Sequence, residues 1–218
     1  MKRKCAALML VVSVVAGLGI ASLAQAATVH YGAFGGLGLS KMRIDPEPTV
    51  GRVSLKAPAF GATVRFELSP TLSIEPGLMY VSDGFSWGES EATDYVGNPL
   101  GTFEQLSVLE HVQVPVLFRY TLPSSGKVRA FGFAGPYGSI HLNEYTRVTG
   151  AIEQKLDTDG LRAAHAGVIL GGGAQTTAGP GQLELQVRYD VGLTSLQESG
   201  LPGNAYANSF RFLLGWSR

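Results

Sequence analysis

The chain has 218 residues, of which 45% are hydrophobic, with 17 basic residues balanced by 17 acidic ones. The apolar content excludes a largely disordered chain, the missing basic excess argues against a nucleic-acid-binding protein, and the single cysteine excludes a disulfide scaffold or Cys-rich zinc site. Its 29 glycines, well above the usual share of about 7%, favour strands and turns over helices.

Residues 1–26 have the pattern of a cleaved secretory signal peptide. A basic start at residues 2–4 precedes the charge-free apolar run Ala6–Leu23, and Ala24-Gln25-Ala26 fits a small-x-small cleavage site. An uncleaved anchor is the alternative, since about 18 apolar residues just span a bilayer. Cleavage near Ala26 predicts an exported chain with one domain, residues 27–218. That domain is mildly acidic, because three of the 17 basic residues leave with the signal and all 17 acidic residues remain.

Beyond the signal, apolar and polar residues alternate with a period of two, which is the pattern of β-strands. In residues 59–68, for example, Phe60 and Phe66 fall on one face, and Thr63 and Arg65 fall on the other. No second apolar run is long enough for a transmembrane helix. The predicted strands cover residues 30–40, 59–68, 72–81, 112–120, 128–140, 163–175, 183–191 and 209–216.

The connections between these strands alternate in length. Three are short, at residues 69–71, 123–127 and 176–181, and four are long and polar, at residues 41–57, 84–105, 142–160 and 196–207. Short turns at one end and long loops at the other are typical of outer-membrane barrels. We therefore predict an all-β fold, an eight-stranded antiparallel up-and-down transmembrane β-barrel with long extracellular loops and short periplasmic turns.

Charged residues on the polar face of the strands balance in sign. In a soluble barrel or sandwich this face would be outside, whereas in a membrane barrel the apolar face contacts lipid. The sorted loops, the C-terminal strand and the aromatic residues near strand ends favour the membrane barrel; these aromatic residues are Tyr80, Tyr120, Tyr137, Tyr189 and Trp216. The predicted lumen charge network consists of Arg65, Glu67, Glu75, Arg119, Glu184, Arg188, Asp190 and Arg211.

Three segments resemble the PorT-type outer-membrane β-barrel domain family of porin-like small outer-membrane proteins. They are EHVQVPVLFRY at 110–120, FGFAGPY at 131–137 and LQVRYDVGL at 185–193, and the resemblance covers about residues 27–218. It implies an eight-stranded antiparallel barrel in the outer membrane of a Gram-negative bacterium, with a porin-like label and no agreed reaction.

The last predicted strand has the features of a C-terminal assembly signal. Outer-membrane barrels usually end on an aromatic residue, whereas here two residues follow the last aromatic one. We expect the barrel-assembly machinery to recognise this strand during biogenesis. The signal consists of Phe210, Phe212, Leu214 and Trp216.

The sequence predicts a packed lumen more strongly than a functional one. Eight strands enclose a space just wide enough for side chains, and buried charges are expected to pair. A narrow ion or solute channel is the first alternative. The second is a lipid-modifying enzyme, because Ser139 and His141 share a face near the outer end of the fifth strand. No third catalytic residue is evident, so we predict no enzyme, and we expect neither a cofactor nor a metal.

The second long loop is the candidate recognition surface. It combines aromatic residues with acidic ones, and exposed aromatic residues on long loops often mark recognition. We therefore predict a structural or surface-interaction role with outer-membrane lipids as surroundings, an unidentified extracellular ligand and no nucleic acid. The candidate recognition residues are Phe85, Trp87, Tyr95 and Phe103.

Overall fold

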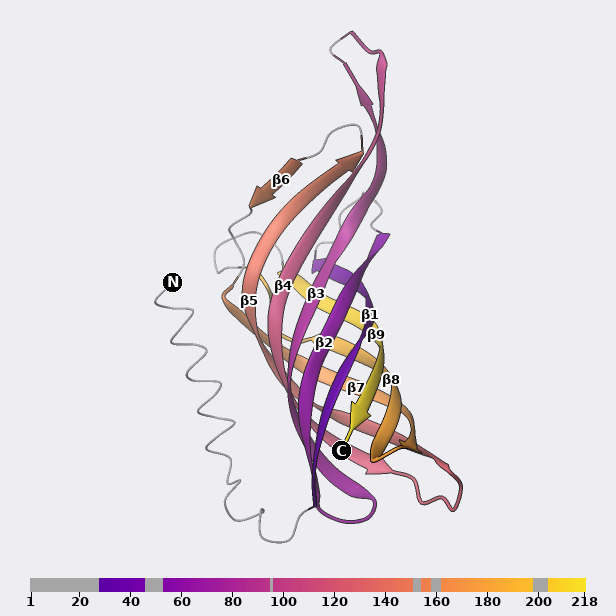
Figure 1. Ribbon diagram of the computed structural model, residues 1–218. Helices are drawn as coiled ribbons and strands as arrows, with labels where there is room; N and C mark the ends of the chain where they lie inside the picture. Colours follow the sequence, from indigo (N-terminus) through magenta and orange to yellow (C-terminus); the bar gives the residue numbers. More distant parts are fainter. Residues whose placement is uncertain (1–27, 46–52, 95, 151–153, 158–161, 198–203) are drawn as a thin grey trace.

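The computed structural model describes residues 28–45, 53–94, 96–150, 154–157, 162–197 and 204–218 (Figure 1). The predicted signal peptide and its cleavage site lie outside the described residues. Within the described ranges, no helix has the length and apolar character needed to cross a membrane.

The described residues form nine antiparallel strands. Eight of them follow the predicted strands, and β6 is a short addition. The strands are β1 (Thr28–Asp45), β2 (Val53–Glu67), β3 (Leu72–Thr93), β4 (Pro99–Thr121), β5 (Val128–Gly150), β6 (Gln154–Asp157), β7 (Ala164–Ala178), β8 (Gly181–Gly192) and β9 (Asn204–Ser217).

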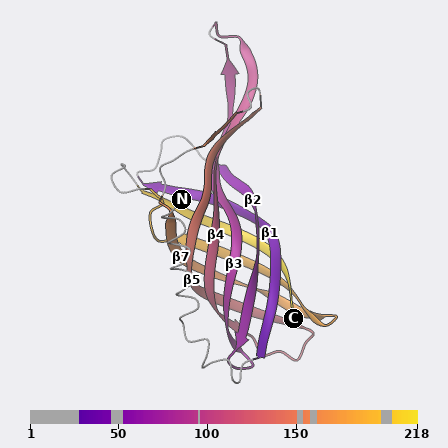
Figure 2. The same cartoon turned by 60° about the vertical axis from the view of Figure 1, so that its left-hand side comes forward.

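Eight strands close into a barrel (Figures 1 and 2). The hydrogen-bonded order is β4-β3-β2-β1-β9-β8-β7-β5, and pairing between β4 and β5 completes the ring. In the described part of the chain, β6 pairs only with the far part of β5, from Tyr145 to Val148, and is not one of the wall strands. The predicted eight-stranded antiparallel barrel is confirmed.

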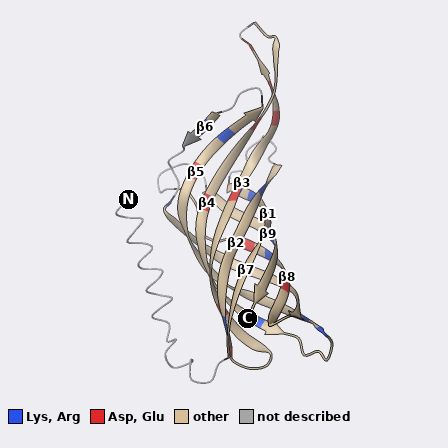
Figure 3. Cartoon of the chain, viewed as in Figure 1, with Lys and Arg blue, Asp and Glu red and all other residues tan. Residues whose placement is uncertain are grey.

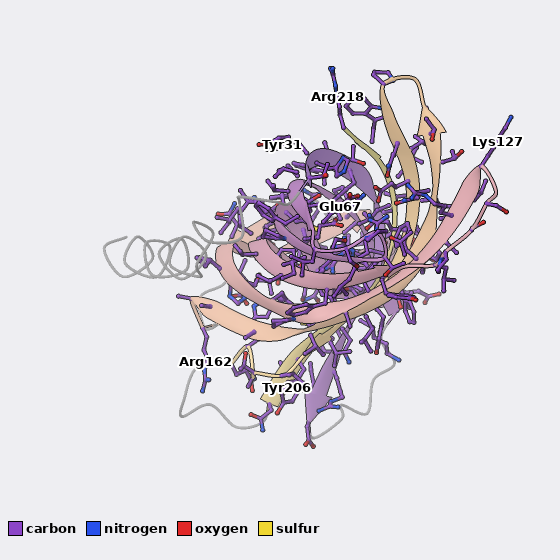
Figure 4. All side chains as sticks on the ribbon, turned by 90° about the horizontal axis from the view of Figure 1, so that it is seen from below. Tyr31, Glu67, Lys127, Arg162, Tyr206 and Arg218 are labelled. Atoms are coloured by element: carbon purple, nitrogen blue, oxygen red, sulfur yellow. The ribbon has the colours of Figure 1, made fainter. Side chains whose placement is uncertain are left out.

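The short turns gather at one end of the barrel, as predicted. This end also holds both ends of the barrel wall, because Tyr31 and Arg218 exchange backbone hydrogen bonds of 2.7 and 2.8 Å. Figure 4 views the molecule from this side and labels Tyr31, Glu67, Lys127 and Arg218 among the residues there. By the topology of outer-membrane barrels, this is the periplasmic end.

The second and third long loops are mostly strand, which corrects the predicted loop bounds. β3 and β4 stay paired from Phe85 opposite Ser107 to Thr93 opposite Pro99, and the part of this hairpin beyond Ser86, where the described part of β2 stops pairing with β3, projects beyond the barrel (Figure 1). β5 likewise continues to Gly150. The alternation of apolar and polar residues disappears in these extensions because both faces of a sheet outside the barrel are exposed to water.

The tip of the hairpin is organised by one carboxylate. The Asp94 side chain accepts hydrogen bonds from the backbone amides of Val96 and Asn98, at 2.9 and 2.8 Å, and from the Asn98 side-chain amide at 2.9 Å. The hydrogen bonds from Asn98 hold the pKa of Asp94 below its usual value. Gly97, with a φ of 92°, supplies the left-handed residue of this turn.

The barrel wall is apolar outside and polar inside. Charged residues occupy few positions along the strands of the wall (Figure 3). Tyr137, expected among the aromatic residues that face the membrane, points into the lumen and is only 4% exposed. It lies on the same face of β5 as the buried Phe131 and Phe133. The exposed apolar side chains of the wall include Leu37, Leu39, Phe60, Leu78, Phe118, Leu170, Leu185, Phe210, Phe212 and Leu214.

Candidate functional site

Four charged side chains close a square across the periplasmic half of the lumen. Arg65 of β2 lies 3.1 Å from Glu75 of β3, Glu75 lies 3.2 Å from Arg119 of β4, and Arg119 lies 2.8 Å from Glu184 of β8. An ion pair between Arg65 and Glu184 completes the square. All four residues are buried. The square is neutral, so each buried charge has two partners of opposite sign.

Neutral groups add further hydrogen bonds to the charge square. The Gln186 side-chain amide and the Ser217 hydroxyl donate to the Glu184 carboxylate at 3.2 and 3.1 Å, and Arg119 donates to the Gln175 carbonyl oxygen. The Arg119 guanidinium also lies 3.5 Å from the centre of the Phe131 ring. These partners were not among the predicted lumen residues, although each falls on the inward face of its strand.

A second network lies nearer the outer end. Arg211 of β9 forms an ion pair of 2.8 Å with Asp83 of β3 and a second one with Asp190 of β8. The Gln113 side-chain amide donates to Asp190 at 3.0 Å, and His111 Nε2 lies 3.4 Å from an Asp83 oxygen. Asp83 was not among the predicted lumen charges because the predicted strand ended at Val81, two residues before it.

Arg188 of β8 lies between the two networks and differs from the other lumen arginines. It is 1% exposed, and the described residues place no carboxylate within ion-pair distance of it. Its guanidinium instead contacts the Met79 sulfur at 2.9 Å and the Gln186 carbonyl oxygen at 3.0 Å. Arg188 also stands directly opposite Arg211 in the pairing of β8 with β9. The lumen therefore buries one cation that has only neutral contacts.

Glu67, expected in the lumen network, lies at the periplasmic rim. Its side chain is 39% exposed and pairs with His30 at 3.2 Å. The alternation of β2 is correct up to this residue, but the strand ends there. Among the described residues, the buried charges of the lumen still balance in sign, because Asp83 takes the place of Glu67. The basic ones are Arg65, Arg119, Arg188 and Arg211, and the acidic ones are Glu75, Asp83, Glu184 and Asp190.

Three histidines from different strands meet beside the outer network. His141 Nε2 and His165 Nδ1 lie 2.8 Å apart, and the His111 ring centre lies 5.0 Å from that of His165. Ser139 is close by, but its hydroxyl donates to the backbone carbonyl of Val112 at 3.2 Å. The geometry thus gives Ser139 a backbone partner where a nucleophile would need a base. Over the described ranges, no set of three or more His, Cys, Asp or Glu side chains fits a metal ion.

The four candidate recognition residues have different environments. Phe85 is 6% exposed, so the expectation that it is an exposed loop residue is wrong. Trp87 and Phe103 are partly buried, and Tyr95 lies outside the described residues. Phe85 is buried because β3 carries its inward face past the predicted strand end. It belongs to an apolar plug, formed by Met42, Phe85, Leu109, Leu196, Ala205 and Ala207.

The C-terminal strand shows one apolar face to the outside. Its last residue, Arg218, still hydrogen-bonds to β1, so the two residues after the final aromatic side chain belong to the closed wall. Alternate side chains of β9 point outward and are at least 42% exposed, namely Phe210, Phe212, Leu214 and Trp216.

Solved outer-membrane barrels resemble the chain in structure. Neisserial surface protein A covers 88% of this chain and 98% of its own, with 11% identity and a TM-score of 0.47. OprG from Pseudomonas aeruginosa covers 87% and 93%, with 12% identity and a TM-score of 0.45. Ail, the attachment invasion locus protein of Yersinia pestis, covers 87% and 98%, with 11% identity and a TM-score of 0.43.

The sequence comparisons give a family and no individual relative. No curated protein matches the sequence. The profile of the family described as outer membrane protein beta-barrel domain matches residues 23–198, which is most of the chain. The chain therefore belongs to this family of outer-membrane β-barrel proteins, and its location is the Gram-negative outer membrane.

Proposed function

We propose that the protein is a porin-like barrel of PorT type with a structural or surface-interaction role and no catalytic activity. In this proposal a signal peptide is cleaved near Ala26 and residues 27–218 form the mature barrel. The resemblance of residues 110–120, 131–137 and 185–193 to PorT-type sequences supports the subgroup. The hydrogen bond of Ser139 to a backbone carbonyl supports the absence of catalysis.

The projecting hairpin is the observation that carries the surface role. Within the described residues, β2 last pairs with β3 at Ser86, whereas β3 and β4 remain paired to Thr93. Seven further residues extend about 24 Å at the usual rise of a strand. Because the backbone of a paired hairpin is already ordered, binding to it costs little further conformational entropy. The hairpin is therefore a preorganised surface outside the membrane.

The wall of the barrel suits a structural role in the membrane. Its outward apolar side chains match the lipid-facing band of outer-membrane barrels. We propose outer-membrane lipids as its surroundings. We also propose that the assembly machinery reads the exposed face of β9, with Trp216 as the aromatic residue nearest the C-terminus.

The folded protein is expected to conduct no ions. The charge square, the second network and the apolar plug fill successive levels of the lumen, and a path through them would have to break buried ion pairs. Planar-bilayer recordings should show no single-channel steps, with a general porin as the positive control. Reproducible steps from heat-modifiable, folded protein would contradict the proposal and favour the narrow channel.

Removing the hairpin should abolish surface interaction and spare the barrel. Glu89 pairs with Glu104, so replacing residues 89–104 by Asn-Gly keeps the strand register with a two-residue turn. Cells with this variant should attach to surfaces less than cells with the unaltered protein, while the purified variant keeps its heat-modifiable gel mobility. The same replacement of the periplasmic turn 123–127 is the matched control and should leave attachment unchanged. Equal attachment by all three forms would leave only the structural role.

A further inference from the structure

The apolar outer face of β1 ends in two cations. Lys41 and Arg43 are exposed, whereas the residues that alternate with them, Ser40 and Met42, are buried on the lumen side. Tyr31 is exposed on the same outward face, at the periplasmic end of the strand. Ten residues separate Tyr31 from Lys41, which at the usual strand rise and tilt is about 25 Å along the barrel axis. That is the height of the lipid-facing apolar band, so both cations stand at its outer edge.

The neighbouring strand β9 places an aromatic residue at the same level. Tyr206 pairs directly with Arg43, and the Arg43 guanidinium lies over its ring, 4.7 Å from the ring centre. Trp216, exposed at the periplasmic end of β9, follows ten residues later. The two aromatic residues of β9 therefore mark both edges of the apolar band. The cation–π contact also holds the Arg43 side chain against the wall.

A third cation comes from β2. Lys56 is exposed and pairs with Leu39 of β1, and Lys41 is the next residue on the outward face of β1. The two lysines are therefore diagonal neighbours, about 7–8 Å apart at the backbone. Among the described residues, no ion pair joins either lysine or Arg43 to a carboxylate, although Asp45 follows one step further out on β1. These three side chains, Lys41, Arg43 and Lys56, form the basic patch.

A phosphate group matches the chemistry of the basic patch. Its oxygens accept from several donors at once, with an ammonium group acting as a point charge and a guanidinium donating two parallel hydrogen bonds. Two lysines that repel each other across the strands are stabilised when one anion lies between them. The basic patch therefore favours a phosphorylated ligand over a neutral one.

The surroundings of the basic patch favour a lipid over a soluble phosphate. Exposed apolar side chains continue from the patch toward the membrane centre, namely Leu37, Leu39 and Phe60. Acyl chains in contact with these side chains hold a headgroup at the level of the patch, whereas a soluble phosphate has no such anchor. The outer leaflet of the Gram-negative outer membrane is built from a phosphorylated glycolipid, which has both parts.

We propose that the basic patch is a binding site for the phosphorylated glycolipid of the outer leaflet. Lys41 and Lys56 hold one phosphate between them, and Arg43, positioned by Tyr206, donates to the headgroup from the outer side. The acyl chains lie along the apolar face of β1 and β2. This inference rests on the proposed lipid surroundings of the wall and deepens them, because it gives the wall one preferred lipid at one place.

The lipid headgroup gives the first test. The unaltered protein in dodecyl maltoside micelles is titrated with diphosphoryl lipid A and with the same lipid A after removal of its phosphates, and bound lipid is counted by native mass spectrometry. The phosphorylated lipid should bind at least about tenfold more tightly, and glucosamine 1-phosphate at equal concentration should not displace it. Equal binding of the two lipids would overturn the proposal. Displacement by glucosamine 1-phosphate would assign the patch to soluble phosphates and refute the lipid.

Two variants with a matched control locate the site. Lys41→Gln and Lys56→Gln should each weaken binding of the phosphorylated lipid about fivefold, the usual effect of one cation near an anionic surface, and leave the dephosphorylated lipid unaffected. Lys127→Gln makes the same change at an exposed lysine of the periplasmic turn and should bind the lipid normally. Undiminished binding in both site variants would place the lipid elsewhere and refute the site.

Heat-modifiable gel mobility, recorded for every protein, separates this inference from the proposed function. Site variants that keep the mobility shift and lose the lipid support the basic patch. Folded, heat-modifiable protein that binds both lipids equally contradicts the basic patch alone. An unaltered protein without heat-modifiable mobility would contradict the proposed barrel and the patch together. The site variants should also attach to surfaces as the unaltered protein does, because their hairpin is intact.

Discussion

Glu184→Gln is expected to destabilise the folded barrel by about 3–5 kcal/mol, the usual effect of removing one partner from a buried ion pair. The Glu184 carboxylate accepts from two arginines, Arg65 and Arg119. In the variant these guanidiniums share the single charge of Glu75, while the barrel leaves them no route to water. The free energy of unfolding in urea, measured for the protein in lipid vesicles, gives the effect.

Glu67→Gln is the matched control, because it changes the same group at the periplasmic rim. Its pair with His30 is partly exposed, so we expect a loss of less than about 1 kcal/mol. The double variant Glu184→Gln/Arg119→Met should recover part of the stability, since it removes one of the two cations left short of a partner. Equal losses for Glu184→Gln and Glu67→Gln would show that the charge square contributes nothing beyond an ordinary surface pair.

Arg188→Met is expected to have the opposite effect and to stabilise the barrel by about 1–4 kcal/mol, the range seen when a buried ion pair or triad is replaced by apolar groups of similar size. The guanidinium has only neutral contacts, and Met79 and two aromatic rings already surround it. Removing it also relieves its repulsion from Arg211, the residue opposite in β9. Urea unfolding in vesicles again measures the change.

Arg119→Met is the control for this second expectation. It makes the same substitution at a cation that has two carboxylate partners, Glu75 and Glu184, and should destabilise the barrel by about 3–5 kcal/mol. A loss of stability for Arg188→Met as large as that for Arg119→Met would mean that charge pairing does not govern the lumen, and that the guanidinium stabilises through its packing alone.

The wall of the barrel was predictable because two environments act on alternate residues. Lipid outside and a packed polar lumen inside impose a period of two wherever a strand lies in the wall. All eight wall strands carry that signal. The prediction fails near the ends of the strands. β3 continues past Val81, so Asp83 and Phe85 face the lumen. β2 ends at Glu67, so the Glu67 side chain lies at the rim and not in the lumen.

The lumen partners depend on pairings that a single sequence does not reveal. His111, His141 and His165 meet because β4, β5 and β7 are neighbours with a particular register. That register includes an irregularity between Glu110 and His111, which shifts the pairing with β5 by one residue. A cavity of about 190 Å³ at the outer end of the barrel has the same origin, since its lining comes from five strands and from Gln197.

The projecting hairpin also bears on how copies of the barrel coexist in one membrane. Among the described residues, β3 has no partner strand on its free side beyond Ser86, and such an edge is a template for pairing with a second chain. Glu89 and Glu91 are exposed on this stretch of β3. Pairing of two identical edges would bring these carboxylates together. Their repulsion therefore opposes edge-to-edge pairing of neighbouring copies into a continuous sheet above the membrane.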